Sequence, residues 1–235
     1  MPIDQEKYAV RVEQLVRTYR AGRDTVTALA GVDAGFERGT FTAVMGPSGS
    51  GKSTLLQHAA GLDRPTSGRV WIGDTELSKL SETRLTKLRR ERIGFVFQTY
   101  NLIGALTVRE NIELPLRLAG ARAGQDWVDE VVERVGLRDR LRHRPSELSG
   151  GQQQRVAIAR ALATRPDVIF SDEPTGALDS HTAAEVLTLL RSVVDAYGQT
   201  VVMVTHDPVA ASYADRRLTM SDGRIMRDDA LVRVG

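Results

Sequence analysis

The segment GPSGSGKS, residues 46–53, constrains the fold of this chain more than any other part of its sequence. It satisfies the pattern G-x-x-x-x-G-K-[ST], which a chain of this length matches by chance about 1% of the time. An apolar run, FTAVMG at 41–46, precedes it, and an amphipathic stretch that begins at Lys52 follows it. Its glycines let the backbone wrap closely, so that successive N–H groups point inward. The segment therefore predicts an anion-binding loop at a strand-to-helix turn.

This loop carries the groups that bind a phosphate chain together with a metal ion. The N-terminus of the following helix adds a partial positive charge. We expect Lys52 to neutralise the β- and γ-phosphates and the Ser53 hydroxyl to ligate Mg²⁺. The alternative, a glycine turn with an incidental lysine, is disfavoured by the strand and helix patterns on either side. The residues predicted to bind the phosphates are Gly46, Ser48, Gly49, Ser50, Gly51, Lys52, Ser53 and Thr54.

Three further apolar runs end on polar side chains, and with 41–46 they make four candidate strands. They are IGFVFQ at 93–98, DVIFSDE at 167–173 and TVVMVTH at 200–206. Continuous apolar runs of this length suit strands that are buried on both faces, as in a parallel sheet covered by helices. Such sheets bind ligands at the carboxyl ends of their strands. Four strands that deliver polar groups to one edge therefore predict one site.

Two carboxylates at the end of the third of these strands supply further chemistry. We expect Asp172 to hold Mg²⁺ through water, and Glu173 to orient and deprotonate the attacking water. Taken alone, such a pair is equally often a helix cap or a salt bridge, and the phosphate loop favours the functional interpretation. Gln98 is predicted to be a further magnesium or water contact and His206 a γ-phosphate contact, although a lone histidine after a strand is more often structural. The other histidines, His58, His143 and His181, are interpreted as structural.

Helical patterns fill much of the remaining sequence. Residues 182–197 place Val186, Leu189, Leu190, Val193 and Tyr197 on one stripe, and residues 126–135 do the same with Trp127, Val131 and Val135. The segment from 99 to about 147 contains no candidate for a buried strand, which predicts a helical subdomain inserted into the sheet. Near the end of the chain, RLTM-SDGR-IMRD is typical of a hairpin with a glycine-containing turn.

The segment LSGGQ at 148–152 has the features of a second, weaker anion site. Ser149 and Gln152 have the spacing of a helix capping box, with Gly150 and Gly151 in the first turn. The simpler interpretation is a well-capped helix start. Glycines in the first turn, however, expose backbone N–H groups at the positive end of the helix. Because this site has no lysine, it would be useful only to a nucleotide that is already held elsewhere.

Composition excludes several classes of protein. The absence of cysteine excludes disulfides, thiolate catalysis and cysteine-rich zinc sites, and it fits a cytosolic protein. A net charge of +2 gives no support to nucleic-acid binding, and none is expected. The N-terminal segment MPIDQEKYAVRVEQ carries charges from its fourth residue and is not a signal peptide. No stretch approaches the roughly 20 apolar residues of a membrane-spanning helix.

Taken together and in their order along the chain, these motifs resemble the ATP-binding cassette (ABC) ATPases. The resemblance covers essentially the whole chain and rests on the phosphate loop, Gln98, LSGGQ, VIFSDE at 168–173, GALD at 176–179 and His206. It implies an α/β fold of the P-loop NTPase (RecA-like) type, with a mostly parallel sheet, an antiparallel β region at the N-terminal side and an inserted helical subdomain. The chain would be a single ABC ATPase domain, 1–235, with a catalytic core at 1–98 and 165–235 and the helical subdomain at about 99–164.

The resemblance also implies how the second anion site is used. Two cassettes pair head to tail, here as a homodimer, so that Ser149, Gly150, Gly151 and Gln152 of one subunit close over ATP held by the phosphate loop of the other. Tyr19 would stack on adenine, and Asp179 would lie in the loop that links the two sites. ATP then joins the subunits, and hydrolysis releases them. The expected cofactors are ATP and Mg²⁺.

The segment QTYNLIGALTVRENIELPL at 98–116 resembles the branch of macrolide exporters, lipoprotein-release complexes and the related cell-division ATPase. Gly104 and Ala177 depart from the proline and asparagine common there. In this branch the ATPase works with a separate integral membrane permease, so we expect a peripheral protein on the cytoplasmic face of the cell membrane. The alternative is an ABC-type ATPase in cell division or DNA maintenance, although the long heptad runs and zinc modules of chromosome-maintenance members are absent. A translation factor would need two cassettes, and a nucleotide sensor would not need Glu173 and His206.

Overall fold

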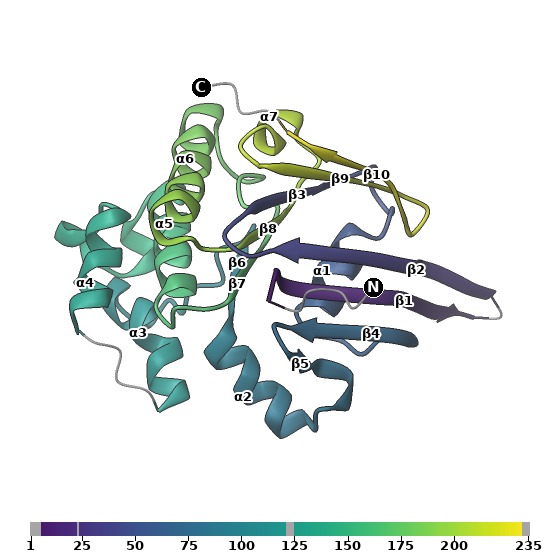
Figure 1. Cartoon of the computed structure of the whole chain (residues 1–235). Coiled ribbons are helices and arrows are strands. Elements are labelled where there is room, and N and C mark those ends of the chain that lie inside the picture. The colour runs from purple at the N-terminus through teal and green to yellow at the C-terminus, as the bar shows by residue number, and fades with distance from the viewer. Residues whose placement is uncertain (1–5, 23, 121–124, 232–235) are drawn as a thin grey trace.

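A six-stranded sheet lies at the centre of the computed structural model, which describes residues 6–22, 24–120 and 125–231 (Figure 1). Its strand order is β10-β9-β3-β8-β7-β6, and all neighbours are parallel except β9 and β10. The strands are β3 (Phe41–Met45), β6 (Ile93–Phe97), β7 (Val168–Asp172), β8 (Val201–Val204), β9 (Arg216–Ser221) and β10 (Arg224–Ala230). The four apolar runs therefore form adjacent parallel strands, as predicted.

Both faces of this sheet are covered along β3, β6, β7 and β8, which explains why these four strands are largely apolar. In β8, Val201 and Met203 belong to one buried cluster, whereas Val202 and Val204 belong to another. The first cluster joins the sheet to α3 (Val108–Ala119), α4 (Gln125–Arg134), α5 (Gly150–Leu162) and α6 (Ser180–Tyr197). The second joins it to α1 (Lys52–Ala59), α2 (Glu82–Arg92) and the antiparallel strands. Because successive side chains of a strand point to opposite faces, nearly every residue of these runs is apolar, and the small side chains of Thr42 and Ser171 are the buried polar exceptions among the four strands.

A second, antiparallel sheet has the order β2-β1-β4-β5. Its strands are β1 (Tyr8–Ala21), β2 (Asp24–Glu37), β4 (Ser67–Ile72) and β5 (Thr75–Glu76). The predicted antiparallel region at the N-terminal side is confirmed. Half of its strands, however, come from residues 67–76, after the phosphate loop, where no local sequence pattern predicts strands.

The helices are α1 (Lys52–Ala59), α2 (Glu82–Arg92), α3 (Val108–Ala119), α4 (Gln125–Arg134), α5 (Gly150–Leu162), α6 (Ser180–Tyr197) and α7 (Pro208–Ala211), with short 3-10 turns η1 (Leu77–Lys79), η2 (Arg138–Arg140) and η3 (Pro145–Glu147). Every described element between β6 and β7 is helical, and in Figure 1 these helices gather on one side of the molecule. The proposed boundaries at 98/99 and 164/165 remain a prediction. None of the described helices is long and apolar enough to cross a bilayer.

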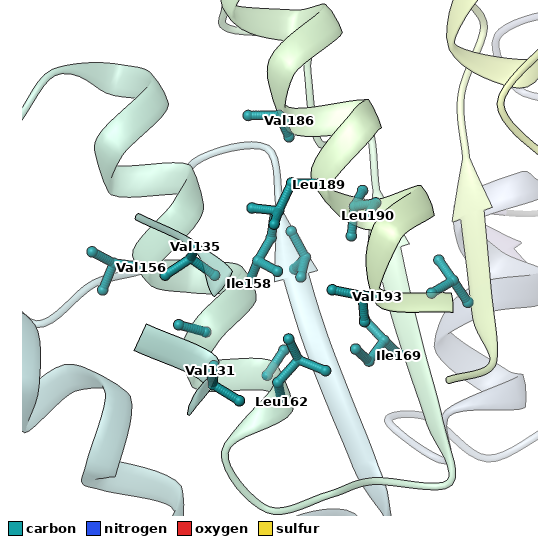
Figure 2. Packing of buried hydrophobic residues seen from close by; sticks show 14 of the residues in the cluster. Val131, Val135, Val156, Ile158, Leu162, Ile169, Val186, Leu189, Leu190 and Val193 are labelled. Atoms are coloured by element: carbon teal, nitrogen blue, oxygen red, sulfur yellow. The ribbon is translucent and has the colours of Figure 1, made fainter. Parts of the chain in front are cut away.

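The two helices predicted from their apolar stripes are confirmed as α4 and α6. Figure 2 shows the side chains of α6 facing those of α4, α5 and β7 across one buried cluster. In α6 the stripe residues Val186, Leu189, Leu190 and Val193 are buried, and Tyr197 packs against the edge of the cluster. The apolar residues of each helix recur on one face. Packing of this face against the core stabilises the helix.

The predicted C-terminal hairpin is formed by β9 and β10. Ser221 pairs with Arg224 across the turn, and Asp222 and Gly223 both have left-handed backbone angles, with φ of 49° and 71°. Two consecutive residues of this kind define the tight hairpin turn for which Asp-Gly is a preferred sequence.

Candidate functional site

The predicted phosphate loop lines a cavity of about 560 Å³ at the carboxyl edge of the parallel sheet. The cavity is lined by Ala28, Gly46, Pro47, Ser48, Gly49, Gly51, Lys52, Ser53, Thr54, Glu173 and His206. The structure thus brings the loop together with Glu173 and His206, which are more than 100 residues away in the sequence. Ala28, on β2, was not predicted to be here, because nothing in the sequence near it indicates a ligand.

Glycine is required at two positions of the loop, because neighbouring strands approach the loop backbone closely there. Gly46 has a φ of 150° and Gly51 a φ of 97°, both in the range that side chains rarely adopt. A Cβ atom on Gly46 would overlap the carbonyl oxygen of Met220, and one on Gly51 would overlap the carbonyl oxygen of Ala28. The loop is therefore pressed against β2 and β9, which fixes its shape.

Lys52 is only 8% exposed and lies under the loop. Its ammonium group donates hydrogen bonds to the carbonyl oxygens of Gly46 (2.9 Å) and Pro47 (2.8 Å). The charge is thus held inside the curve of the loop, where phosphate oxygens would be stronger acceptors than these carbonyl groups. The buried Ser50 hydroxyl has no hydrogen-bond partner among the described residues. These features fit an anion held by the loop.

The C-terminal hairpin supports the loop from outside. The N–H of Gly223 donates to the carbonyl of Ser50 (3.1 Å), and the N–H of Ala30 donates to the carbonyl of Gly223 (2.9 Å). The Asp-Gly turn therefore connects the phosphate loop to β2. The sequence predicted the turn but not this contact, because no local pattern links residues so far apart.

The Asp172 carboxylate ends β7 next to the start of α1. The Ser53 hydroxyl donates to Asp172 Oδ1 (3.2 Å), so two of the three predicted magnesium ligands lie side by side. Burial raises the pKa of Asp172, and nearby Glu173 adds to this, whereas the Ser53 hydrogen bond and Lys52 act in the opposite direction. A cation bound next to Asp172 would stabilise the charged carboxylate and so offset the free-energy cost of burying it. In the described part of the chain no cluster of three or more acidic or histidine side chains could hold a metal ion alone.

Glu173 and His206 form a pair at the rim of the cavity. His206 Nδ1 lies 2.9 Å from Glu173 Oε1. Glu173 has a left-handed backbone with a φ of 47°, and its N–H donates to the carbonyl of Val204 on β8 (2.9 Å). A strained backbone of this kind at a non-glycine residue is common at functional sites, where neighbouring contacts maintain it. Here it turns the carboxylate toward His206.

The hydrogen bond and charge of Glu173 raise the pKa of His206 above 6.5. His206 therefore favours the folded state at a pH below its ordinary pKa, and this contribution is lost as the pH rises through the raised value.

Replacing Glu173 by Gln removes the charge, so we expect a lower pKa for His206. NMR titration of the His206 ring proton measures this. The control Glu185→Gln, on α6, should leave the pKa of His206 unchanged. An unchanged pKa of His206 in Glu173→Gln would show that the pair does not form.

Gln98 follows β6, beside the end of β7. Phe97 pairs with Asp172 in the sheet, so Gln98 is the next residue along that edge. Its side chain lies against Gly176, where an added Cβ would be 2.7 Å from Gln98 Nε2. Gln98 is not among the residues that line the cavity. Its predicted contact with magnesium or water remains a prediction.

Tyr19 lies on β1 outside the cavity lining and is 39% exposed. The Arg17 guanidinium lies over its ring, 4.6 Å from the ring centroid. The predicted stacking on adenine is not tested by this geometry.

The LSGGQ segment forms the start of α5 and lies outside the cavity lining. Ser149 is the N-cap: its hydroxyl accepts from the N–H of Gln152 (3.3 Å), and the Gln152 side chain accepts from the N–H of Ser149 (3.0 Å). The predicted capping box is therefore confirmed. A Cβ on Gly151 would overlap Thr182 of α6, so this glycine also permits close helix packing.

Asp179 caps α6. Its carboxylate accepts from the N–H (3.0 Å) and hydroxyl (2.7 Å) of Thr182, and these hydrogen bonds lower the pKa of Asp179. His58 is fully buried, with Nδ1 at 2.7 Å from the carbonyl of Thr54, which fits its structural interpretation. The structure thus places the loop, Asp172, Glu173 and His206 in one site, but it does not bring LSGGQ or Asp179 into that site.

Comparison with known proteins identifies the family of this chain. Residues 29–176 match the family model described as ABC transporter. The chain is 44% identical over 228 residues to the uncharacterized ABC transporter ATP-binding protein MJ0796 of Methanocaldococcus jannaschii, covering 94% of this chain and 97% of that protein. It is 45% identical over 221 residues to the macrolide export ATP-binding/permease protein MacB of Vibrio parahaemolyticus, covering 93% of this chain but only 34% of MacB. The chain therefore spans about a third of that relative.

Solved structures agree. A dimeric, post-hydrolysis state of the ATP-binding cassette MJ0796 bound to ADP and Pi superposes with a TM-score of 0.85 at 43% identity, covering 95% of this chain and 99% of that one. CbiO1 of Clostridium perfringens, part of the ABC transporter complex cbiONQ, superposes with a TM-score of 0.84 at 32% identity, covering 96% and 89%. The predicted P-loop NTPase fold and the predicted family are both confirmed, and the chain belongs to the ABC transporter family as an ATP-binding subunit.

Proposed function

We propose that this chain hydrolyses ATP as one of two identical subunits that close head to tail, and that this closure drives a separate membrane permease. The observation that carries the proposal is the incomplete site. The cavity contains the phosphate loop, Glu173 and His206, whereas the exposed cap at Ser149 lies outside it. A second copy can supply that helix start to the nucleotide. The dimeric state of the similar cassette MJ0796, bound to ADP and Pi, supports this arrangement.

Each residue of the site then has a role in hydrolysis. Glu173 accepts a proton from the attacking water and orients it, and His206 donates a hydrogen bond to the γ-phosphate. Lys52 neutralises the β- and γ-phosphates. Ser53, Gln98 and Asp172 would hold Mg²⁺, the last through water, and the bound ion would supply positive charge that offsets the charge developing on the phosphates.

An apolar groove supports a membrane-protein partner. It has a volume of about 390 Å³ and lies between β6 and α3, with exposed leucines such as Leu118, which is 56% exposed. Arg89, Arg90 and Arg160 add positive charge at its border. An apolar surface of this kind on an otherwise ordinary protein surface is typical of an interaction site. We propose that a cytoplasmic segment of the permease contacts it, which places this subunit at the cytoplasmic face of the membrane. The relatives named for transport and macrolide export favour this role over cell division or DNA maintenance.

The proposed role of α5 is tested by Ser149→Ala. ATP binding to the isolated subunit should be unchanged, because the phosphate loop is intact. Turnover at concentrations where dimers form should fall at least about tenfold, because one donor to the γ-phosphate region is lost. Phosphate release and fluorescent-nucleotide binding measure the two quantities.

The matched control is Ser81→Ala, which removes the N-cap of α2 in the same way. Each variant should lose about 1 kcal/mol of folding stability. If both variants retain wild-type turnover, or if Ser149→Ala weakens ATP binding in the isolated subunit, the role assigned to Ser149 is wrong.

A further inference from the structure

Arg160, near the C-terminal end of α5, is a partly buried cation at the edge of the apolar groove, and its hydrogen bonds go to one loop. Its Nη1 donates to the carbonyl of Asn101 (2.6 Å) and its Nη2 to the carbonyl of Tyr100 (2.9 Å). Burial lowers the pKa of this guanidinium, and no ion pair within the described part of the chain compensates for it. Burial of a charge without a counter-charge costs free energy. The two hydrogen bonds are therefore the feature that explains an arginine at this position.

The loop that Arg160 contacts is strained. Tyr100 and Asn101 have φ angles of 60° and 49°, so two consecutive non-glycine residues are left-handed. Such residues persist only where contacts from outside the segment hold them. The carbonyl groups that Arg160 binds belong to these two residues. Arg160 therefore holds the strained backbone in place.

The same loop carries Gln98, two residues before Tyr100. The Gln98 side chain lies against Gly176, in the loop that follows Glu173. Helix α5 also contacts that second loop, because Gln154 Nε2 donates to the carbonyl of Pro174 (2.6 Å). One helix thus fastens both of the loops that follow β6 and β7, and a shift of the first loop would move Gln98 relative to the carboxylates.

We propose that Arg160 is a positioning residue for ATP hydrolysis: it holds the backbone of Tyr100 and Asn101 and so fixes Gln98 beside Asp172. This inference rests on the proposed function. The contacts that connect Arg160 to Gln98 do not include the phosphate loop. Loss of the guanidinium should therefore impair turnover and leave the affinity for ATP unchanged.

Arg160→Met tests the proposal, since it removes the donors and keeps an apolar stem. We expect kcat to fall about 10- to 100-fold, as for other small misplacements of a catalytic contact. The KM for ATP, and binding of a fluorescent ATP analogue without Mg²⁺, should be unchanged. Hydrogen exchange of peptides that contain residues 98–101 should be faster, and exchange at 46–54 should not change. The control Arg155→Met lies on the same helix but contacts Val135 and Glu185 instead, and it should behave as wild type.

A double-mutant cycle separates positioning from general destabilisation. In a Gln98→Ala background, Arg160→Met should cause little further loss of kcat, because both changes remove the same contribution. An equal loss in both backgrounds, or unchanged exchange at 98–101, overturns the proposal. If Arg160→Met does not fold, Arg160→Lys takes its place: it keeps the charge but lacks the planar fork that spans two carbonyl groups, so an intermediate loss is expected.

The outcomes also distinguish this inference from the proposed function. If the wild-type chain releases no phosphate from ATP, the proposed function fails. The exchange experiment needs no turnover and still decides whether Arg160 holds the loop. If the wild type is active and Arg160→Met is equally active, only the inference fails.

Discussion

Glu173→Gln should bind ATP but turn it over about 10²- to 10⁴-fold more slowly than the wild type, the range that a general base contributes. The amide has the size of the carboxylate and leaves the phosphate loop unchanged, so affinity is retained. Because hydrolysis is what releases the two subunits, the variant should also accumulate as an ATP-bound dimer. Phosphate release measures the first effect, and size-exclusion chromatography with ATP measures the second.

Glu133→Gln is the control, since that side chain lies on the surface of α4, where it forms an ion pair with Arg138. It should hydrolyse ATP and dissociate like the wild type. Wild-type turnover in Glu173→Gln would show that another group activates the water.

Lys52→Ala should weaken ATP binding about 10- to 100-fold, the equivalent of one or two charge-assisted hydrogen bonds. The ammonium group is buried under the loop, between the carbonyl groups of Gly46 and Pro47. Of the described residues, His206 is the other side chain lining the cavity that can carry a positive charge. Titration calorimetry with ATP, in the absence of Mg²⁺, measures the change directly.

The control for this experiment is Lys79→Ala, an exposed lysine in η1 that pairs with Glu76. Its affinity for ATP should equal that of the wild type. If Lys52→Ala also binds ATP with unchanged affinity, the cavity beside the loop is not the phosphate site.

The central sheet and its functional edge could be predicted from the sequence because the signals are local. Each of the four apolar runs ends in the residue that reaches the edge, and parallel strands bring those ends together without further information. The strand pattern therefore predicts Asp172 and Glu173 beside the loop, and the Ser53–Asp172 hydrogen bond agrees with that prediction.

Contacts between distant segments could not be predicted in this way. Strand β4 joins the antiparallel sheet by pairing with β1, and residues 67–72 carry no pattern that specifies this partner. The support of Ser50 by Gly223 is of the same kind, since an Asp-Gly turn predicts a hairpin but not what the hairpin touches.

Backbone strain is equally invisible in the sequence. The left-handed conformations of Glu173 and Tyr100 contradict the preferences of these residue types, and the surrounding hydrogen bonds maintain them together with that of Asn101. The contribution of Arg160 depends on that strain, which is why the motif pattern alone gave no reason to select it.

The dependence of specific ATPase activity on protein concentration tests the central idea that two chains complete each site. We predict that phosphate release per molecule rises with concentration, approaches a plateau once dimers predominate, and falls toward zero at dilutions where sedimentation shows only monomers. Full activity per molecule in those strictly monomeric samples would contradict the account.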